Sequence, residues 1–202
     1  MRVKLLQPIH GFASNTYLIS SGDEYAVVDP SVPYDEGMIS GKLKYVLLTH
    51  AHFDHMLEID SWVKAGAKVI VSIEEQGALA DADINCYRLF CGQNRGYYGV
   101  SSGMRDGDKL TLGSDEILII GCPGHTRMGL SYYSDGVLFA GDTLFAGGGF
   151  GRWDLPGGDY RTLRNTISRL TELSDDTVIY CGHGEPTTMK EYKEHYKNQR
   201  CI

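Results

Sequence analysis

The chain of 202 residues contains 42% hydrophobic and 22% charged residues and has a formal net charge of −7. This balance is typical of an ordinary globular protein, and we expect residues 1–202 to form a single domain. The negative charge disfavours a nucleic-acid partner, because phosphate binding needs clustered Lys and Arg.

Two further features indicate a cytoplasmic protein. The N-terminus lacks an apolar run of signal-peptide length, and no run in the chain approaches the length of a transmembrane helix. The five cysteines are an odd number in a chain too large to need disulfide bridges, so we expect reduced thiols. We therefore predict cytoplasmic localisation and no membrane partner.

The first half of the chain alternates short strands with a helix. The predicted elements are strands at 16–20, 24–29, 44–50 and 67–72 and a helix at 57–66. The first two strands flank a turn composition and predict a hairpin, and the run 44–50 is apolar enough for the interior of a sheet. Residues 74–106 offer no clear pattern, which is typical of a pocket wall or a lid.

The second half repeats this order without repeating the sequence. The predicted elements are strands at 108–113, 116–121, 130–134, 137–142 and 177–183 and helices at 159–173 and 188–199. Asp159 is the expected N-cap of the clearest helix, whose apolar stripe runs from Tyr160 through Ile167 to Leu173. In both halves polar residues follow apolar strands directly, where active sites of layered folds often lie.

The most informative segment is "THAHFDH", residues 49–55. His50 and His52 are two positions apart, so an extended backbone places both side chains on the same side. Asp54 and His55 are adjacent to each other at the predicted helix entrance and would aim at a neighbouring point. Because neutral imidazoles and carboxylates are metal ligands, this spacing predicts two metal positions.

Other strand ends offer partners for this segment. His125 follows a strand in "IIGCPGHT", Asp142 in "LFAGDT" and His183 in "IYCGHG", each among small residues that let backbones approach closely. Asp29 in "VVDPS" lacks such flanks, and we leave it out. Any one of these alone would equally fit a core histidine, a cap or a turn residue, but together with residues 50–55 they predict one metal centre.

Four motifs, "THAHFDH", "PGHT", "GDTLF" and "CGHG", resemble those of the metallo-β-lactamase fold superfamily in identity and order. The stretch 141–159 is most similar to the glyoxalase II-like hydrolases, a group with small members that lack a separate helical C-terminal domain. This resemblance implies an α+β fold, the four-layer αββα metallo-β-lactamase sandwich, with metals at one edge of the two packed sheets.

The resemblance also implies residue roles. The first metal would be bound by His50, His52 and His125, and the second by Asp54, His55 and His183, with Asp142 bridging the two. Two divalent ions, expected to be zinc with iron or manganese as alternatives, would hold a hydroxide between them. Asp54 would also orient that hydroxide as a catalytic residue. The implied reaction is hydrolysis of a small-molecule thioester such as S-lactoylglutathione.

Two other activities of the superfamily stay open. An iron-dependent persulfide dioxygenase would use a smaller set resembling His50, His125 and Asp142. A lactonase would use the same hydroxide to open a lactone. The sequence leaves the oligomeric state and the substrate undefined.

Some features depart from the resemblance or lie outside it. Arg127 and Met128 stand where the family commonly has Pro-Gly, and residues 81–103 match nothing in the family pattern. In the glycine-rich loop 147–158 we expect an ion pair between Arg152 and Asp154 that fixes the loop. Tyr97 and Tyr98, in a polar glycine-rich segment, are the expected residues at the pocket mouth.

Overall fold

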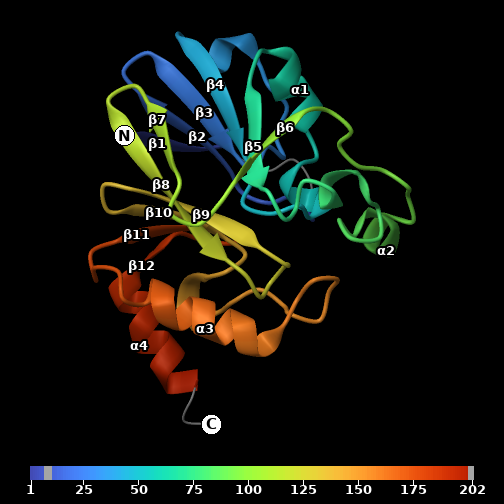
Figure 1. The fold of residues 1–202 in the computed structure, drawn as a ribbon. Coiled ribbons are helices and arrows are strands. Elements are labelled where there is room, and N and C mark those ends of the chain that lie inside the picture. The colour runs from blue at the N-terminus through green and yellow to red at the C-terminus, as the bar shows by residue number, and fades with distance from the viewer. Residues whose placement is uncertain (7–10, 200–202) are drawn as a thin grey trace.

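The computed structural model describes residues 1–6 and 11–199. Two six-stranded sheets make up its centre (Figure 1). The first sheet contains, in spatial order, β1 (Arg2–Leu6), β2 (Thr16–Ser21), β3 (Glu24–Val28), β4 (Lys42–Leu47), β5 (Lys68–Ser72) and β6 (Ser101–Met104). β1, β2 and β3 are antiparallel neighbours, whereas β3 to β6 run parallel.

The second sheet is almost entirely antiparallel. It contains, in spatial order, β12 (Thr187–Thr188), β11 (Val178–Cys181), β10 (Val137–Gly141), β9 (Gly129–Ser134), β8 (Asp115–Cys122) and β7 (Lys109–Leu112). Only β10 and β11 pair in parallel, and the helix α3 (Tyr160–Leu170) lies between them in the chain.

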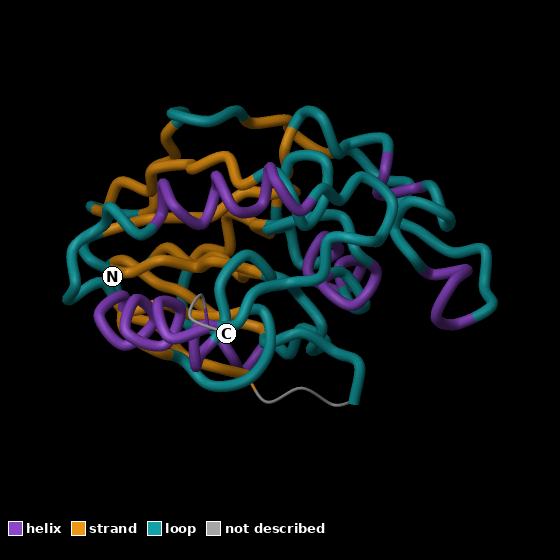
Figure 2. Tube along the Cα trace, turned by 90° about the horizontal axis from the view of Figure 1, so that it is seen from below, coloured by secondary structure: helices purple, strands orange, loops and turns teal. Residues whose placement is uncertain are grey.

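The helices cover the outer faces of the two sheets. α1 (Ile59–Lys64) packs on the first sheet, whereas α3 and α4 (Met189–Gln199) pack on the second. Figure 1 shows α3 and α4 below the second sheet and the short helix α2 (Tyr87–Cys91) in a lobe that projects to the right. Figure 2 shows the long loops gathered at the same end of the sandwich as this lobe. The predicted αββα architecture is confirmed.

Three apolar clusters hold the four layers together, and the strand alternation explains them. On β4, Val46 packs toward α1 while the adjacent Leu47 packs between the two sheets. On β10, Phe139 packs between the sheets while Leu138 packs toward α3 and α4. Because successive strand residues point to opposite faces, apolar residues on both faces bury a strand completely.

Several predicted elements differ in extent from the observed ones. β4 ends at Leu47, so the predicted strand 44–50 is three residues too long, and the backbone is irregular from there to the first histidine. β6 lies within the segment predicted to be irregular, and its backbone pairs in parallel with β5. The terminal helix α4 is anchored to the second sheet by Met189 and Tyr192, which are fully buried.

The predictions for α3 are confirmed at its start and along its core face. The Asp159 side chain accepts a hydrogen bond from the Thr162 amide at 2.7 Å, as an N-cap does. Ile167 is fully buried, but Tyr160 is 41% exposed and does not join the stripe.

Two expectations concern bulk properties. Cysteines 86, 91, 122 and 181 are free thiols, as predicted, and Cys201 lies outside the described residues. No helix among residues 1–6 and 11–199 is long and apolar enough to cross a membrane.

Candidate metal centre

All seven residues predicted for the site converge at the loop-rich end of the sandwich. Four come from the segment that follows β4, and three come singly from the ends of β8, β10 and β11. Their ligand-type atoms form three overlapping groups within which all distances are at most 4.8 Å. The groups are His50, His52 and His125; His50, His55 and Asp142; and Asp54, His55 and His183.

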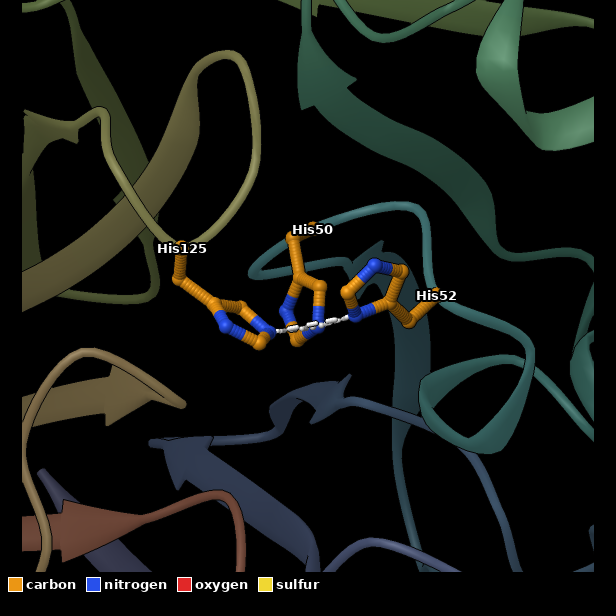
Figure 3. Close-up of side chains that lie close together, drawn as sticks. All are labelled: His50, His52 and His125. Carbon is orange, nitrogen blue, oxygen red and sulfur yellow. Dashed lines mark hydrogen bonds between the residues drawn. The ribbon is translucent and has the colours of Figure 1, made fainter. Parts of the chain in front are cut away.

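The first group is a triangle of ring nitrogens (Figure 3). His50 Nε2 lies 3.0 Å from His52 Nδ1, and His125 Nε2 lies 3.1 Å from His52 Nδ1 and 3.3 Å from His50 Nε2. All three side chains are buried. Nitrogens at about 2.0–2.1 Å around one tetrahedral ion are separated by about 3.3 Å, so this triangle has the dimensions of a three-histidine site.

The outer nitrogens of two of these rings, those of His50 and His125, are fixed by neighbouring groups. His125 Nδ1 donates to the carbonyl of Arg152 at 2.6 Å, and His50 Nδ1 lies 3.0 Å from the Thr49 hydroxyl. Such contacts fix the ring orientation and place the proton on the outer nitrogen. The nitrogen that faces the centre of the triangle is then unprotonated, and its lone pair points into the triangle. His50 and His125 are thus already oriented toward the centre of the triangle.

The second group lies beside the first. His183 Nε2 is 3.1 Å from Asp54 Oδ2, and His55 Nε2 is 3.8 Å from the same oxygen. Asp142 stands between the groups, because its Oδ1 lies 3.3 Å from His55 and its Oδ2 lies 3.7 Å from His125. Its Oδ2 is also 3.6 Å from His183 Nε2. One carboxylate therefore faces both clusters.

The electrostatics of His50, His52 and Asp142 favour a bound cation. Burial lowers the pKa of His50 well below its usual value, and the neighbouring His55 lowers it further; burial likewise lowers the pKa of His52 to about 3. Burial raises the pKa of Asp142, but His55 and the other histidines outweigh this and hold it well below its usual range. Neutral imidazoles and ionised carboxylates are the protonation states that metal ions require.

Unsatisfied polar atoms lead to the same conclusion. Asp142 Oδ1 and His55 Nε2 are buried and, apart from facing each other at 3.3 Å, have no hydrogen-bond partner in the described part of the chain. Burying a polar oxygen or nitrogen without a full set of partners costs free energy unless another group binds to it. Convergent nitrogen lone pairs, carboxylate oxygens and these orphaned atoms together fit divalent metal ions.

Sequence reasoning missed Asp29, which lies directly behind the site. Its Oδ1 accepts from the Thr49 amide at 2.8 Å, and its Oδ2 accepts from the Thr49 hydroxyl at 2.7 Å and contacts His55 Nδ1 at 2.8 Å. Asp29 is 2% exposed and has a φ of 49°, a conformation that Asp tolerates better than most residues. With Asp54 and Asp142 it raises the pKa of His55 well above its usual value despite burial, which acts in the opposite direction.

Sequence reasoning also missed Glu75, a buried carboxylate between the two halves of the site. Its Oε2 accepts from the Ala51 amide and its Oε1 from the Met128 amide, both at 2.9 Å. Glu75 therefore ties the loop carrying His50 and His52 to the loop carrying His125. Neither Asp29 nor Glu75 stands at a sequence spacing typical of metal ligands. The only signal that could have identified them is that buried carboxylates require hydrogen-bond donors such as backbone amides.

A pocket of about 290 Å³ opens over the centre. Its floor contains site residues, and its walls contain Phe12, Phe53, Cys86, Phe90, Phe145, Gly151, Arg152 and Leu155. The expected ion pair is confirmed, because Arg152 donates two hydrogen bonds of 2.7 Å to the Asp154 carboxylate. The expectation for Tyr97 and Tyr98 is wrong: Tyr97 is buried in the cluster under α1, and Tyr98 does not line the pocket.

Comparison with known proteins agrees with this geometry. The chain is 31% identical to a probable metallo-hydrolase, YqgX, of Bacillus subtilis, over 89% of both chains. It is 30% identical to the hydroxyacylglutathione hydrolase GloC of Haemophilus influenzae, over 96% of this chain and 95% of that one. Among solved structures, the BLEG-1 B3 metallo-β-lactamase matches with a TM-score of 0.86 and 28% identity, over 96% of this chain and 98% of that one.

A family model covers most of the chain. The model described as the metallo-beta-lactamase superfamily matches residues 10–183, which include every residue of the centre. Members of this superfamily bind divalent metal ions, and the His-rich centre described above stands where such ions would bind. The chain belongs to the metallo-β-lactamase superfamily.

Proposed function

We propose that the protein is a dinuclear metal-dependent hydrolase that cleaves thioesters. The observation that carries this proposal is Asp142, whose two oxygens face the first histidine group and the second group at once. A carboxylate in that position is suited to bridging two ions. His50, His52 and His125 would hold one ion, and Asp54, His55 and His183 the other.

Two bound divalent ions would supply Lewis acidity for a carbonyl oxygen and a water acidic enough to ionise near neutral pH. The chain's own residues position the reactants. Asp54, whose Oδ2 lies 3.1 Å from His183 Nε2, lines the pocket and would accept a hydrogen bond from the attacking water. The backbone carbonyl that accepts from His125 keeps that ring from turning.

Among the described residues that line this pocket, none is a competing nucleophile. Cys86 lines the pocket, but burial and the nearby Asp54 carboxylate raise the pKa of its thiol to about 11. At neutral pH it is a protonated thiol and a poor nucleophile. Activated water is therefore the attacking group that the pocket favours.

A thioester suits such a site for a chemical reason. A thiolate leaving group has a parent pKa of about 8.5, so it departs without a dedicated general acid. The described residues that line the pocket include no carboxylic acid beyond the proposed ligands. The similarity over nearly full length to a hydroxyacylglutathione hydrolase supports thioester hydrolysis.

The proposal is tested by metal analysis of protein purified without added metal, together with an assay of thioester hydrolysis by thiol release. We expect about two divalent ions per chain and hydrolysis that is lost on chelation and restored by zinc. A single tightly bound iron with oxygen uptake on glutathione persulfide would instead establish a dioxygenase. Turnover of lactones without turnover of thioesters would establish a lactonase.

A further inference from the structure

We propose that the preferred substrate is a thioester with an apolar, aromatic-sized acyl group on a thiol that carries no carboxylate. This inference rests on the proposed hydrolysis and concerns the wall of the pocket opposite the metal centre. That wall is built from the lobe around α2, from the glycine-rich loop and from the N-terminal segment.

The wall is aromatic. Phe53 and Phe90 stack with ring centroids 5.9 Å apart at 27°, and Phe90, on α2, is 43% exposed at the mouth. Phe145 lies on the other side, with its ring centroid 6.3 Å from that of His183. Phe12, 69% exposed, adds a further ring. Aromatic side chains left open around a reactive centre mark an apolar binding surface, because leaving them in water is unfavourable.

The half-exposed Phe90 stacks on Phe53, which belongs to a buried apolar cluster. Phe53, Cys86 and Leu155 are buried together in a cluster that also includes Tyr87, whose ring lies 5.0 Å from Phe53. The apolar surface is therefore fixed in shape before a substrate arrives. A preformed apolar wall beside polar reacting groups is the usual composition of a small-molecule site.

The wall lacks an available cation. Among the described residues lining the pocket, Arg152 is the only Lys or Arg, and two of its donors are already bonded to Asp154 at 2.7 Å. A carboxylate on the thiol portion would find this guanidinium neutralised by its partner. Placing that carboxylate against aromatic rings would cost desolvation energy without a compensating ion pair.

The experiment uses four thioesters: phenylacetyl and lactoyl groups, each on uncharged N-acetylcysteamine and on glutathione. Each kcat/KM is divided by the rate of uncatalysed alkaline hydrolysis, so that intrinsic reactivity cancels. We expect phenylacetyl to exceed lactoyl by at least about tenfold on both thiols. With either acyl group the uncharged thiol should exceed glutathione, and a preference for the glutathione thioester would overturn the inference.

Two variants locate the preference. Phe90→Ala should lower kcat/KM for the phenylacetyl substrate about tenfold and leave the lactoyl substrate within about twofold. Leu89→Ala is the matched control, because Leu89 is the adjacent residue of α2 and is 63% exposed but does not line the pocket. It should change neither substrate.

The outcomes separate this inference from the function on which it rests. Hydrolysis of lactoylglutathione in preference to the phenylacetyl thioesters would overturn the inference and leave the thioesterase standing. Equal losses with both acyl groups in Phe90→Ala would give that residue a structural role and overturn the inference as well. No thioester turnover by metal-loaded protein would overturn both.

Discussion

The two sheets contribute to the metal centre in different ways. The first sheet supplies four candidate ligands from one continuous segment, residues 50–55, at the end of β4. The second sheet supplies three residues, His125, Asp142 and His183, from the ends of three separate strands. The continuous side of the centre, residues 50–55, is thus determined locally by six residues. The dispersed side, formed by His125, Asp142 and His183, depends on the register of a whole sheet.

This difference explains where supporting residues are found. The local segment is held from behind by Asp29, which bonds to both Thr49 and His55. The dispersed side is held by close backbone approach, as at Gly182, whose amide donates to the Gly141 carbonyl at 2.8 Å. The continuous side needs a brace for its loop, and the dispersed side needs small residues that leave room for its strands to converge.

The largest effect is expected where the two sides meet. Asp142→Ala removes the one carboxylate that faces both groups, so we expect metal content to fall below two per chain and kcat/KM to fall by more than about 100-fold. Metal analysis and thioester kinetics measure this. Asp176→Ala, at an exposed position before β11, is the control and should change neither. Full metal content and activity in Asp142→Ala would show that the two sides do not share this carboxylate.

The same contrast governs how much of the molecule could be predicted from sequence. Residues 50–55 could be assigned to two positions because the period of an extended chain fixes which neighbours share a side. His125, Asp142 and His183 could be found as polar residues after apolar strands, but the sequence did not show how far apart they lie. Their convergence depends on strand pairing in the second sheet, which is a nonlocal property.

The residues that were missed have a common cause. Asp29 and Glu75 act on backbone amides and on a histidine far away in sequence, so no local pattern marks them. β6 was missed because its sequence, Ser-Ser-Gly-Met, has weak strand preference and is held by pairing with β5. Phe90 lies in a segment without a periodic hydrophobic pattern, and its role follows only from the position of α2 over the pocket.

Asp29→Asn tests whether Asp29 holds the continuous side in place. Asn has the same shape and tolerates the left-handed backbone, but it removes the negative charge beside His55 and cannot accept all three hydrogen bonds equally well. We expect metal affinity to fall by about 10–100-fold, as for other residues that orient a ligand. Titration with zinc in a competing chelator measures it. Unchanged affinity would mean that residues 50–55 keep their geometry without this carboxylate.

Gly182→Ala tests the close approach on the dispersed side. The added Cβ would press against Asp142 Oδ1 and lie 2.8 Å from His55 Cε1. We expect overpacking to cost about 1–3 kcal/mol of stability and to lower kcat/KM about tenfold. Gly77→Ala is the matched control, because no heavy atom lies within 4 Å of its added Cβ. If the two variants behave alike in urea unfolding and in kinetics, the tight packing around Asp142 has no role in the site.

The smallest expected effect is on the pH dependence of stability in the metal-free protein, through histidines of the continuous side. Burial lowers the pKa of His52 to about 3, so below its ordinary pKa near about 6.5 the unfolded chain binds a proton there that the folded chain does not. Stability of the metal-free protein should therefore fall as the pH falls through this window. His55 acts in the opposite sense: its pKa is raised on folding, so its contribution is present at low pH and is lost as the pH rises through that raised value.

His52→Gln isolates the contribution of His52, because glutamine does not titrate. Between pH 6.5 and 5, the metal-free wild type should lose about 1–2 kcal/mol more unfolding free energy than this variant, measured by urea denaturation in chelator. Bound metal should raise the unfolding free energy of the wild type without removing its pH dependence, because a metal-bound imidazole also carries no proton. Parallel pH profiles without metal would show that the loop rearranges to expose His52, and that the continuous side keeps its closed geometry only when a cation is bound.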